Sequence, residues 1–280
     1  MANPQKIYSA CRPMKVFWMF SGGASSLKAT FDDSNNGTLY TNVGAYADKE
    51  DAKGRQLCRD EGVREFFVSR RDFYSQHQLN PRDRDSRRKF YDALGERIDK
   101  EFNPDIICLS GYMHIVSDPL LGYRPILNIH PADLAILSGP TVSRLDASQL
   151  LLAQAKEFSR ARGLSRKFRG ENAVYDAVAA SERSTRSTLH MATEVFDEGP
   201  IVVQSKPFYV EPDVHEKTLR GCLDGVPEYA AALQDKMKMQ GDGPAYLKAL
   251  ELISRGRLSM DGETIFLDGS ELPYCGLRLG

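Results

Sequence analysis

The chain has 280 residues, of which 41% are hydrophobic and 27% charged, and its formal net charge is −1. This composition is typical of a soluble globular protein, and the balanced charge argues against nucleic acid as a partner. No apolar run approaches the roughly 18–20 residues that span a bilayer, so we expect no membrane partner. Five cysteines without a C-x-x-C pair favour reduced thiols and no metal site, and the N-terminus lacks the apolar core of a signal peptide. Together these features predict a cytoplasmic protein.

The first half of the chain alternates short apolar runs with amphipathic segments. Strands are predicted at 15–20, 38–47, 64–69, 105–111 and 125–131, and helices at 25–34, 49–62 and 81–102. Continuous apolar runs are typical of strands that are buried on both faces, as in a parallel sheet. The alternation therefore predicts an α/β fold with an open, mostly parallel sheet flanked by helices.

Three features refine this outline. The helix at 81–102 has Pro81 near its start, and Phe90, Leu94 and Ile98 form one apolar stripe along it. Two late strands are expected around 187–196 and 200–210. The tail, 213–280, is expected to be mainly helical and to end in a hairpin with Asp261 and Gly262 at its turn. We expect one domain over residues 1–280.

The segment at about 140–170 reads as a basic helical insertion. Asp146 is the expected N-cap of its helix and Gly163 the expected stop. A basic cluster follows, either as a solvated helix end or as a site for an anion; its members are Arg160, Arg162, Arg166, Lys167 and Arg169. Leu150, Leu151 and Leu152 could serve an interface, which would make the protein a homodimer.

Three short stretches are candidate sites. The small residues of "SGGASS" (21–26) let backbone N–H groups approach an anion at a helix start, although a plain tight turn has the same composition. Asn128 and His130 are two apart at the end of a strand, so their side chains share a face where open α/β sheets bind ligands. A carboxylate from Asp197, in "DEGP", would raise the pKa of His130 if it reached the ring, but it also fits an ordinary turn.

Together these pieces resemble the folate-dependent formyltransferase family, and most resemble the members that act on glycinamide ribonucleotide. "PDIICLSGYMHIVS" is similar to the family's "PDLVVLAGFMRIL", and "ILNIHPADL" to its "NIHPSLLP". "STLHMATEVFDEGPIVVQ" is similar to "TVHFVDEGLDGGPII", and it keeps the seven-residue step from His190 to Asp197. "VFWMFSGGASSLKA" and "GRLSMDGETIFLDG" are similar to the first strand with its phosphate loop and to the tail.

The resemblance implies a Rossmann-like formyltransferase fold and a reaction. An amine would attack the formyl carbon of 10-formyltetrahydrofolate, and the catalytic residues would be Asn128, His130 and Asp197. Asn128 and a protonated His130 would donate to the oxyanion, and Asp197 would keep His130 protonated. The residues expected to line the donor pocket are Leu109, Gly111, Met113, Ile115 and Val116. The residues expected to hold a phosphate of the acceptor are Gly22, Gly23, Ala24, Ser25 and Ser26.

The chain also departs from the family pattern. "ADLAILSG" stands where "SLLPKFPG" is usual, so both prolines and the basic residue are missing there. Ala24, Ser26 and His114 replace a Gly, an Asn and an Arg of the family. Counting back from Tyr246 makes Asp242 the nearest counterpart of a tail Glu that helps hold the acceptor amine.

We therefore expect transfer of a formyl group to a small, phosphorylated amine, either glycinamide ribonucleotide or a related amine. No metal is implied by this residue set. Two alternatives stay open: a non-catalytic module that binds folate or a nucleotide, and hydrolysis of 10-formyltetrahydrofolate without an acceptor. We expect neither the regulatory domain that precedes the core of the deformylases nor the barrel that follows it in the tRNA-specific members.

Overall fold

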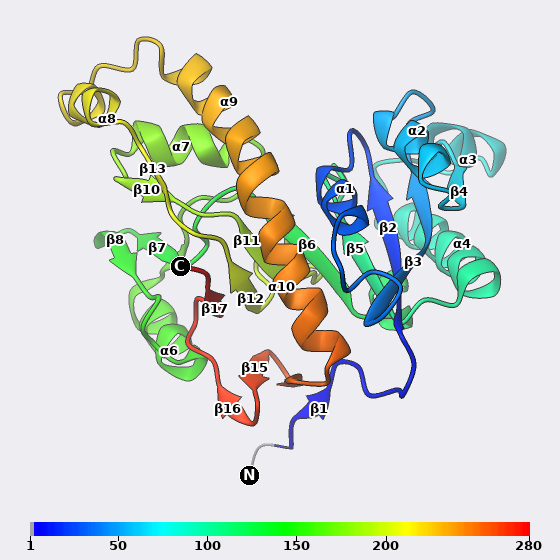
Figure 1. Ribbon diagram of the computed structural model, residues 1–280. Helices are drawn as coiled ribbons and strands as arrows, with labels where there is room; N and C mark the ends of the chain where they lie inside the picture. Colours follow the sequence, from blue (N-terminus) through cyan, green and yellow to red (C-terminus); the bar gives the residue numbers. More distant parts are fainter. Residues whose placement is uncertain (1–2) are drawn as a thin grey trace.

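The computed structural model describes residues 3–280 and is built around one eight-stranded sheet (Figure 1). The order of its strands is β17-β12-β11-β6-β5-β2-β3-β4. The five strands from the first half of the chain are parallel; they are β2 (Met14–Phe20), β3 (Tyr40–Ala47), β4 (Glu65–Phe67), β5 (Ile106–Leu109) and β6 (Ile126–His130). The α/β fold with a mostly parallel sheet is therefore confirmed.

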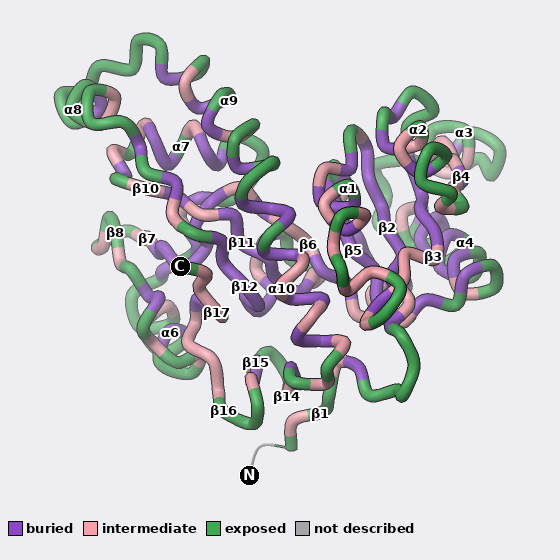
Figure 2. Tube along the Cα trace, in the orientation of Figure 1, coloured by how far each residue is buried: buried purple, intermediate pink, exposed green. Residues whose placement is uncertain are grey.

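The two faces of the sheet form two separate cores. Side chains of a strand alternate between faces, and in β2 Val16, Trp18 and Phe20 enter one core while Phe17 and Met19 enter the other. The helices of the first half are α1 (Ser25–Phe31), α2 (Lys53–Asp60), α3 (Arg70–Gln76), α4 (Arg84–Phe102) and α5 (Leu120–Tyr123). Figure 2 shows the central strands buried and the outer helix faces exposed.

Helix α4 has the expected apolar stripe but a different start. Phe90, Leu94 and Ile98 are all buried. The helix begins at Arg84 rather than near Pro81, because the carboxylate of Asp83 accepts a hydrogen bond from the backbone N–H of Ser86 at 3.1 Å and so caps it.

The two late strands extend the sheet in the opposite direction. β11 (Thr188–Met191) is antiparallel to β6 and to β12 (Ile201–Gln204), and the short β17 (Leu277–Arg278) pairs with β12. The register places His190 opposite Asn128, and Thr188 opposite His130. This pairing puts a second histidine beside the carboxyl end of β6.

The segment after β6 is a small sheet with one helix rather than a helix alone. It contains β7 (Ile136–Gly139), β8 (Val142–Asp146), α6 (Leu152–Arg162) and β9 (Ser165–Arg166). The expected N-cap at Asp146 is wrong: Asp146 ends β8, and its carboxylate accepts from the N–H of Ser148 at 2.9 Å. Gly163 does end the helix, in the left-handed conformation (φ 62°) that glycine adopts readily.

The rest of the chain contains helices and small sheets. The remaining helices are α7 (Ala173–Ala179), α8 (Pro212–Leu219), α9 (Val226–Met237), the π-helical turn η1 (Lys238–Asp242) and α10 (Gly243–Ser254). One small sheet contains β1 (Gln5–Lys6), β14 (Leu258–Asp261), β15 (Thr264–Leu267) and β16 (Ser270–Glu271), and another pairs β10 (Ser184–Thr185) with β13 (Phe208–Tyr209). In residues 3–280 no helix combines the length and the apolar character required to cross a bilayer.

Candidate active site

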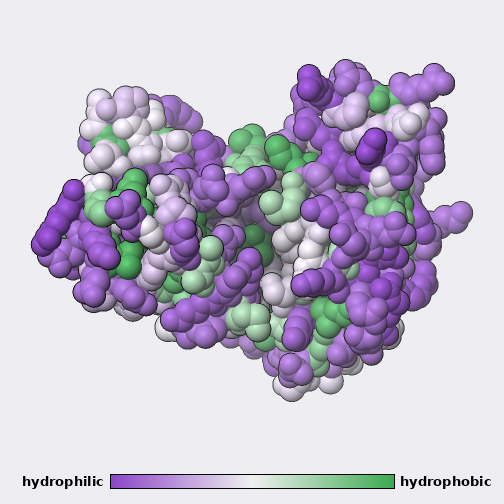
Figure 3. Space-filling model, turned by 90° about the horizontal axis from the view of Figure 1, so that it is seen from above, coloured by the Kyte–Doolittle hydropathy of each residue, from purple (hydrophilic) through white to green (hydrophobic). Residues whose placement is uncertain are grey.

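A cavity of about 840 Å³ lies at the carboxyl ends of the parallel strands. Its walls come from the loops after β2 and β5, the end of β6, the loop before β12, and the junction of α9 with η1. The space-filling view shows the molecule hollowed between its two halves, with hydrophobic side chains beside the hollow (Figure 3). The volume is within the range of small-molecule sites, and the position is where open α/β sheets bind ligands.

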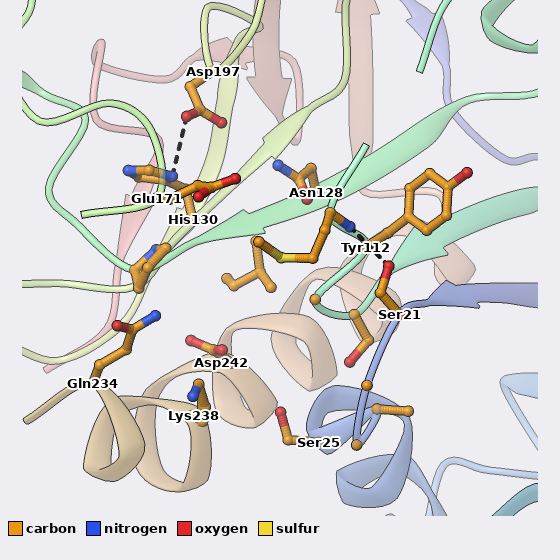
Figure 4. A pocket seen from close by; sticks show the side chains of 18 of the residues that line it. Ser21, Ser25, Tyr112, Asn128, His130, Glu171, Asp197, Gln234, Lys238 and Asp242 are labelled. Atoms are coloured by element: carbon orange, nitrogen blue, oxygen red, sulfur yellow. Dashed lines mark hydrogen bonds and ion pairs between the residues drawn. The ribbon is translucent and has the colours of Figure 1, made fainter. Parts of the chain in front are cut away.

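Buried hydrogen bonds hold the strand ends around this cavity. The hydroxyl of Tyr246, on α10, donates to the carbonyl of Leu109 at 2.6 Å and lies 3.1 Å from that of Leu127, so one side chain spans the ends of β5 and β6. The N–H of Met113 donates to Ser21 Oγ at 3.0 Å (Figure 4), which ties the loop after β5 to the loop after β2.

Asn128, His130 and Asp197, the three predicted catalytic residues, meet in the cavity. Asn128 and His130 come from β6, and Asp197 comes from the loop between β11 and β12. His130 Nδ1 lies 3.2 Å from Asp197 Oδ2, and both side chains are buried (Figure 4). The two residues are far apart in the sequence, and the structure shows that the imidazole and the carboxylate are in contact.

The imidazole of His130 has acceptors on both sides. Its Nε2–H donates to the carbonyl oxygen of Phe168 at 2.8 Å, and its Nδ1 faces the Asp197 carboxylate. Burial lowers the pKa of His130, and the Asp197 charge opposes that shift. The pKa of His130 is lowered overall, and because Nε2–H donates to Phe168, the ring gains or loses its proton at Nδ1, the nitrogen that faces Asp197.

The loop that carries Asp197 is held in an uncommon conformation. Asp197 has φ 55°, and its carboxylate accepts from the N–H of Gly170 at 3.2 Å. Gly199 passes so close to β11 that a Cβ there would lie 1.7 Å from the carbonyl oxygen of Met191. Burial alone would raise the pKa of Asp197, but contacts with His190 and His130 outweigh burial, so its pKa is lowered and the carboxylate stays ionised.

His190 is a site residue to which the sequence analysis gave no role. Its Nδ1–H donates to the carbonyl of Met191 at 2.9 Å, and its Nε2 lies 3.2 Å from the amide nitrogen of Asn128 and 3.5 Å from Asp197 Oδ1. The second N–H of that amide is then free. The sequence shows a histidine in the predicted strand at 187–196, but only the register between β6 and β11 shows that His190 is opposite Asn128.

The predicted donor and phosphate residues are only partly placed at the cavity. Gly111, Met113 and Ile115 line it, and Met113 and Ile115 are 54% and 41% exposed. Leu109 and Val116 do not, because they are buried in the core beneath the loop. In the phosphate loop, Gly22, Gly23, Ala24 and Ser25 line the cavity, whereas Ser26 is buried and its N–H donates to Ser110 Oγ at 3.1 Å.

A stretch similar to the end of the family's loop after Asn-x-His-Pro lies further along the chain. Lys167, Phe168, Arg169 and Gly170 read "KFRG", close to the "KFPG" that the family shows right after its Asn-x-His-Pro motif, and Phe168 and Gly170 contact His130 and Asp197. The pattern is displaced along the sequence by β7, β8 and α6. That spacing is the signal that could have located it.

Polar groups on α9 and η1 reach the cavity from the side opposite β6; they are Gln234, Lys238 and Asp242 (Figure 4). Glu171, which follows Gly170, also lines the cavity. Burial raises the pKa of Asp242 to about 6, and its Oδ1 is buried without a hydrogen-bond partner. A π-helical turn of this kind often occurs at functional sites. Of these residues, only Asp242 was a candidate in the sequence analysis.

The raised pKa of Asp242 predicts a pH-dependent gain in stability for Asp242→Asn. The folded state binds the proton more tightly than the unfolded state, so stability from this group is present below about pH 4 and lost as the pH rises through about 6. At pH 8 the ionised carboxylate costs on the order of 3 kcal/mol. Urea unfolding of Asp242→Asn should show a higher free energy of unfolding at pH 8 and little gain at pH 4; equal gains at both values would contradict this account.

Several predicted features lie outside the cavity. His114 Nε2 lies 2.7 Å from the carboxylate of Asp48, so this side chain joins the loop after β5 to the end of β3. Of the basic cluster, Arg160 and Arg162 are exposed, whereas Arg166 is buried among protein groups. Within residues 3–280, no group of three His, Cys, Asp or Glu side chains could hold a metal ion.

The chain is similar in sequence to known formyltransferases. The family model described as formyl transferase matches residues 14–143. The chain is 23% identical over 269 residues to a phosphoribosylglycinamide formyltransferase of Escherichia coli, covering 94% of this chain and 98% of that protein. Residues after 143 lie outside that match, but the similarity to the relative from Escherichia coli includes most of them.

Solved structures share the fold. A phosphoribosylglycinamide formyltransferase from Coxiella burnetii superposes with a TM-score of 0.66 at 20% identity, covering 96% of this chain and all of that one. A formyltetrahydrofolate deformylase from Pseudomonas syringae superposes with a TM-score of 0.60 at 15% identity, covering 92% of this chain and 66% of that one. At these identities the superpositions show that the fold is shared and nothing about the reaction.

Proposed function

The chain belongs to the formyl transferase family, and we propose that it transfers a formyl group from 10-formyltetrahydrofolate to the amine of a small acceptor. One observation carries the proposal: Asn128 and His130, from β6, meet Asp197, from the loop between β11 and β12, in one cavity, with His130 Nδ1 at 3.2 Å from Asp197 Oδ2. The apolar side chains of Met113, Ile115 and Phe196 line the cavity and suit a flat aromatic donor. The polar groups that line it suit an amine.

Asn128 is the oxyanion donor in the proposed reaction. Attack by an amine on the formyl carbon puts negative charge on the formyl oxygen. One N–H of the Asn128 amide is oriented by His190, and the other is free to donate to that oxygen. Both ring nitrogens of His130 already have partners, so Asn128 takes the larger share of oxyanion stabilisation, on the order of 3 kcal/mol.

His130 and Asp197 handle the proton. The attacking amine must lose a proton, and the leaving folate nitrogen must gain one. The lowered pKa of His130 favours loss of its Nδ1 proton, and Nδ1 with the Asp197 carboxylate at 3.2 Å forms the pair proposed to take up the amine proton. With the proton on the ring, His130 forms an ion pair with Asp197, which stays ionised because its own pKa is lowered. In this proposal the charge on the ring changes during turnover.

The acceptor is proposed to enter beside η1. Asp242 lines the cavity there, and its carboxylate would accept a hydrogen bond from an N–H of the amine. Gly22 to Ser25 and Lys49 border the same part of the cavity, and we keep the prediction that a phosphate of the acceptor contacts this loop. Glycinamide ribonucleotide and related phosphorylated amines are the acceptors to test.

A direct assay tests the proposed function. The protein is mixed with 10-formyltetrahydrofolate, and tetrahydrofolate release is measured with and without glycinamide ribonucleotide and a panel of phosphorylated amines. Acceptor-dependent release is the expected result. Release at the same rate without any amine would replace transfer by hydrolysis. Tight folate binding without release in any mixture would replace it by a binding module.

A further inference from the structure

A buried arginine that is not among the predicted catalytic residues donates hydrogen bonds to the backbone of the Asp197 loop. Arg166, in β9, is only 4% exposed. Its Nη1 donates to the carbonyl oxygen of Asp197 at 2.5 Å, and its Nη2 donates to that of Gly199 at 2.9 Å. Its Nε donates to the hydroxyl of Tyr274 at 3.0 Å, so every nitrogen of the guanidinium has a protein partner.

The loop needs such a contact. Asp197 has φ 55°, a backbone conformation that residues other than glycine rarely adopt. A planar guanidinium donates through two parallel N–H groups and so fixes the positions of two carbonyls at once. The two carbonyls that accept from Arg166 lie on either side of Glu198, and one of them belongs to Asp197, whose carboxylate faces His130.

The same short segment also contacts the catalytic side chains directly. Two residues after Arg166, the carbonyl of Phe168 accepts from His130 Nε2–H, and four residues after it the N–H of Gly170 donates to Asp197 Oδ2. Residues 166–170 thus hold His130 on one side and Asp197 on the other. Arg166 adds the backbone of the Asp197 loop to this set.

We propose that Arg166 is a positioning residue, which keeps the Asp197 carboxylate in contact with His130 by holding the carbonyls of Asp197 and Gly199. The inference rests on the proposed function, because it assigns Arg166 a part in the same reaction. Arg166 is too buried and too fully hydrogen-bonded to bind an anion from solution, which removes it from the phosphate-binding reading of the basic cluster.

Arg166→Lys is the variant that isolates positioning. Lysine keeps the charge but has a single ammonium, which cannot reproduce the two-pronged contact. A misplacement of about 1 Å at a catalytic group can lower turnover by about 10²-fold. We expect kcat to fall by about 10²-fold with KM for the formyl donor changed by less than about threefold. The matched control is Arg160→Lys, an exposed arginine on α6, which should leave kcat unchanged.

The titration of His130, followed by NMR, gives a readout that does not depend on turnover. The charged and titratable groups that face His130 are Asp197, His190 and Arg166. Arg166→Lys preserves the positive charge, so a changed midpoint reports a changed geometry. If the Asp197 carboxylate withdraws, the protonated ring loses its counter-ion, and the midpoint moves to lower pH.

Three results would overturn the inference: an unchanged kcat with an unchanged His130 midpoint, a KM that rises as steeply as kcat falls, or a loss of kcat that only follows a loss of folded protein. If Arg166→Lys does not fold, Tyr274→Phe removes only the hydroxyl that orients Nε. A fall in kcat of about threefold with a lowered His130 midpoint supports positioning, and no change in either contradicts it. A wild-type protein without transferase activity would refute the proposed function, while the NMR midpoints would still decide the role of Arg166.

Discussion

His130→Ala is expected to lower kcat for formyl transfer by about 10³-fold, since proton transfer by a positioned side chain contributes about 10²–10⁴-fold. In the proposed reaction the ring, together with Asp197 at 3.2 Å, takes up the amine proton, and alanine offers no replacement. The wall formed by Gly111, Met113 and Ile115 is untouched, so tetrahydrofolate should bind with nearly unchanged affinity. Steady-state kinetics and a fluorescence titration with tetrahydrofolate measure the two quantities.

This variant removes the ring that contacts the buried Asp197 carboxylate, which costs stability. His130→Gln retains a hydrogen-bonding side chain and serves as the second variant, with thermal unfolding to show that the protein is folded. His77→Ala, an exposed histidine at the end of α3, is the control and should keep wild-type turnover. Wild-type kcat in folded His130→Gln and His130→Ala would rule out His130 as the proton acceptor.

Asp197→Asn is expected to lower kcat by about 10²–10³-fold, because the protonated His130 loses its counter-ion. Asparagine tolerates the left-handed conformation of this residue and can still accept from the N–H of Gly170. The loop should therefore keep its shape while the charge is removed. The change also removes the interaction that opposes burial, so the pKa of His130 should fall further.

The charge of Asp197 also contributes to stability against acid. Its pKa is lowered in the folded state, so the contribution is present above about pH 4 and is lost as the pH falls below it. The difference in free energy of unfolding between wild type and Asp197→Asn should shrink between pH 5 and pH 3. Asp176→Asn, an exposed acid on α7, is the control for both measurements. Full activity in Asp197→Asn would contradict this prediction, because it would show that the protonated His130 ring needs no carboxylate at residue 197.

The sequence determined the elements whose signal is local. The apolar runs of β2, β5 and β6 predicted a buried parallel sheet because a strand covered on both faces needs apolar side chains throughout. The four-residue spacing of Phe90, Leu94 and Ile98 predicted one buried face of a helix. Asn128 and His130 were placed on one face by the two-residue period of a strand, and the family pattern pointed to Asp197.

The tertiary structure decided which distant groups touch and how they titrate. The β6–β11 register puts His190 beside Asn128, and no local pattern encodes the register between strands that are 62 residues apart in the chain. The displaced "KFRG" stretch returns to His130 only because β9 pairs with β7 beyond the inserted elements. Burial of His130, Asp242 and Arg166 depends on every element packed around them. Charge and hydrogen-bond partners in a low-dielectric interior are therefore properties of the assembled fold, and the residue types alone leave them open.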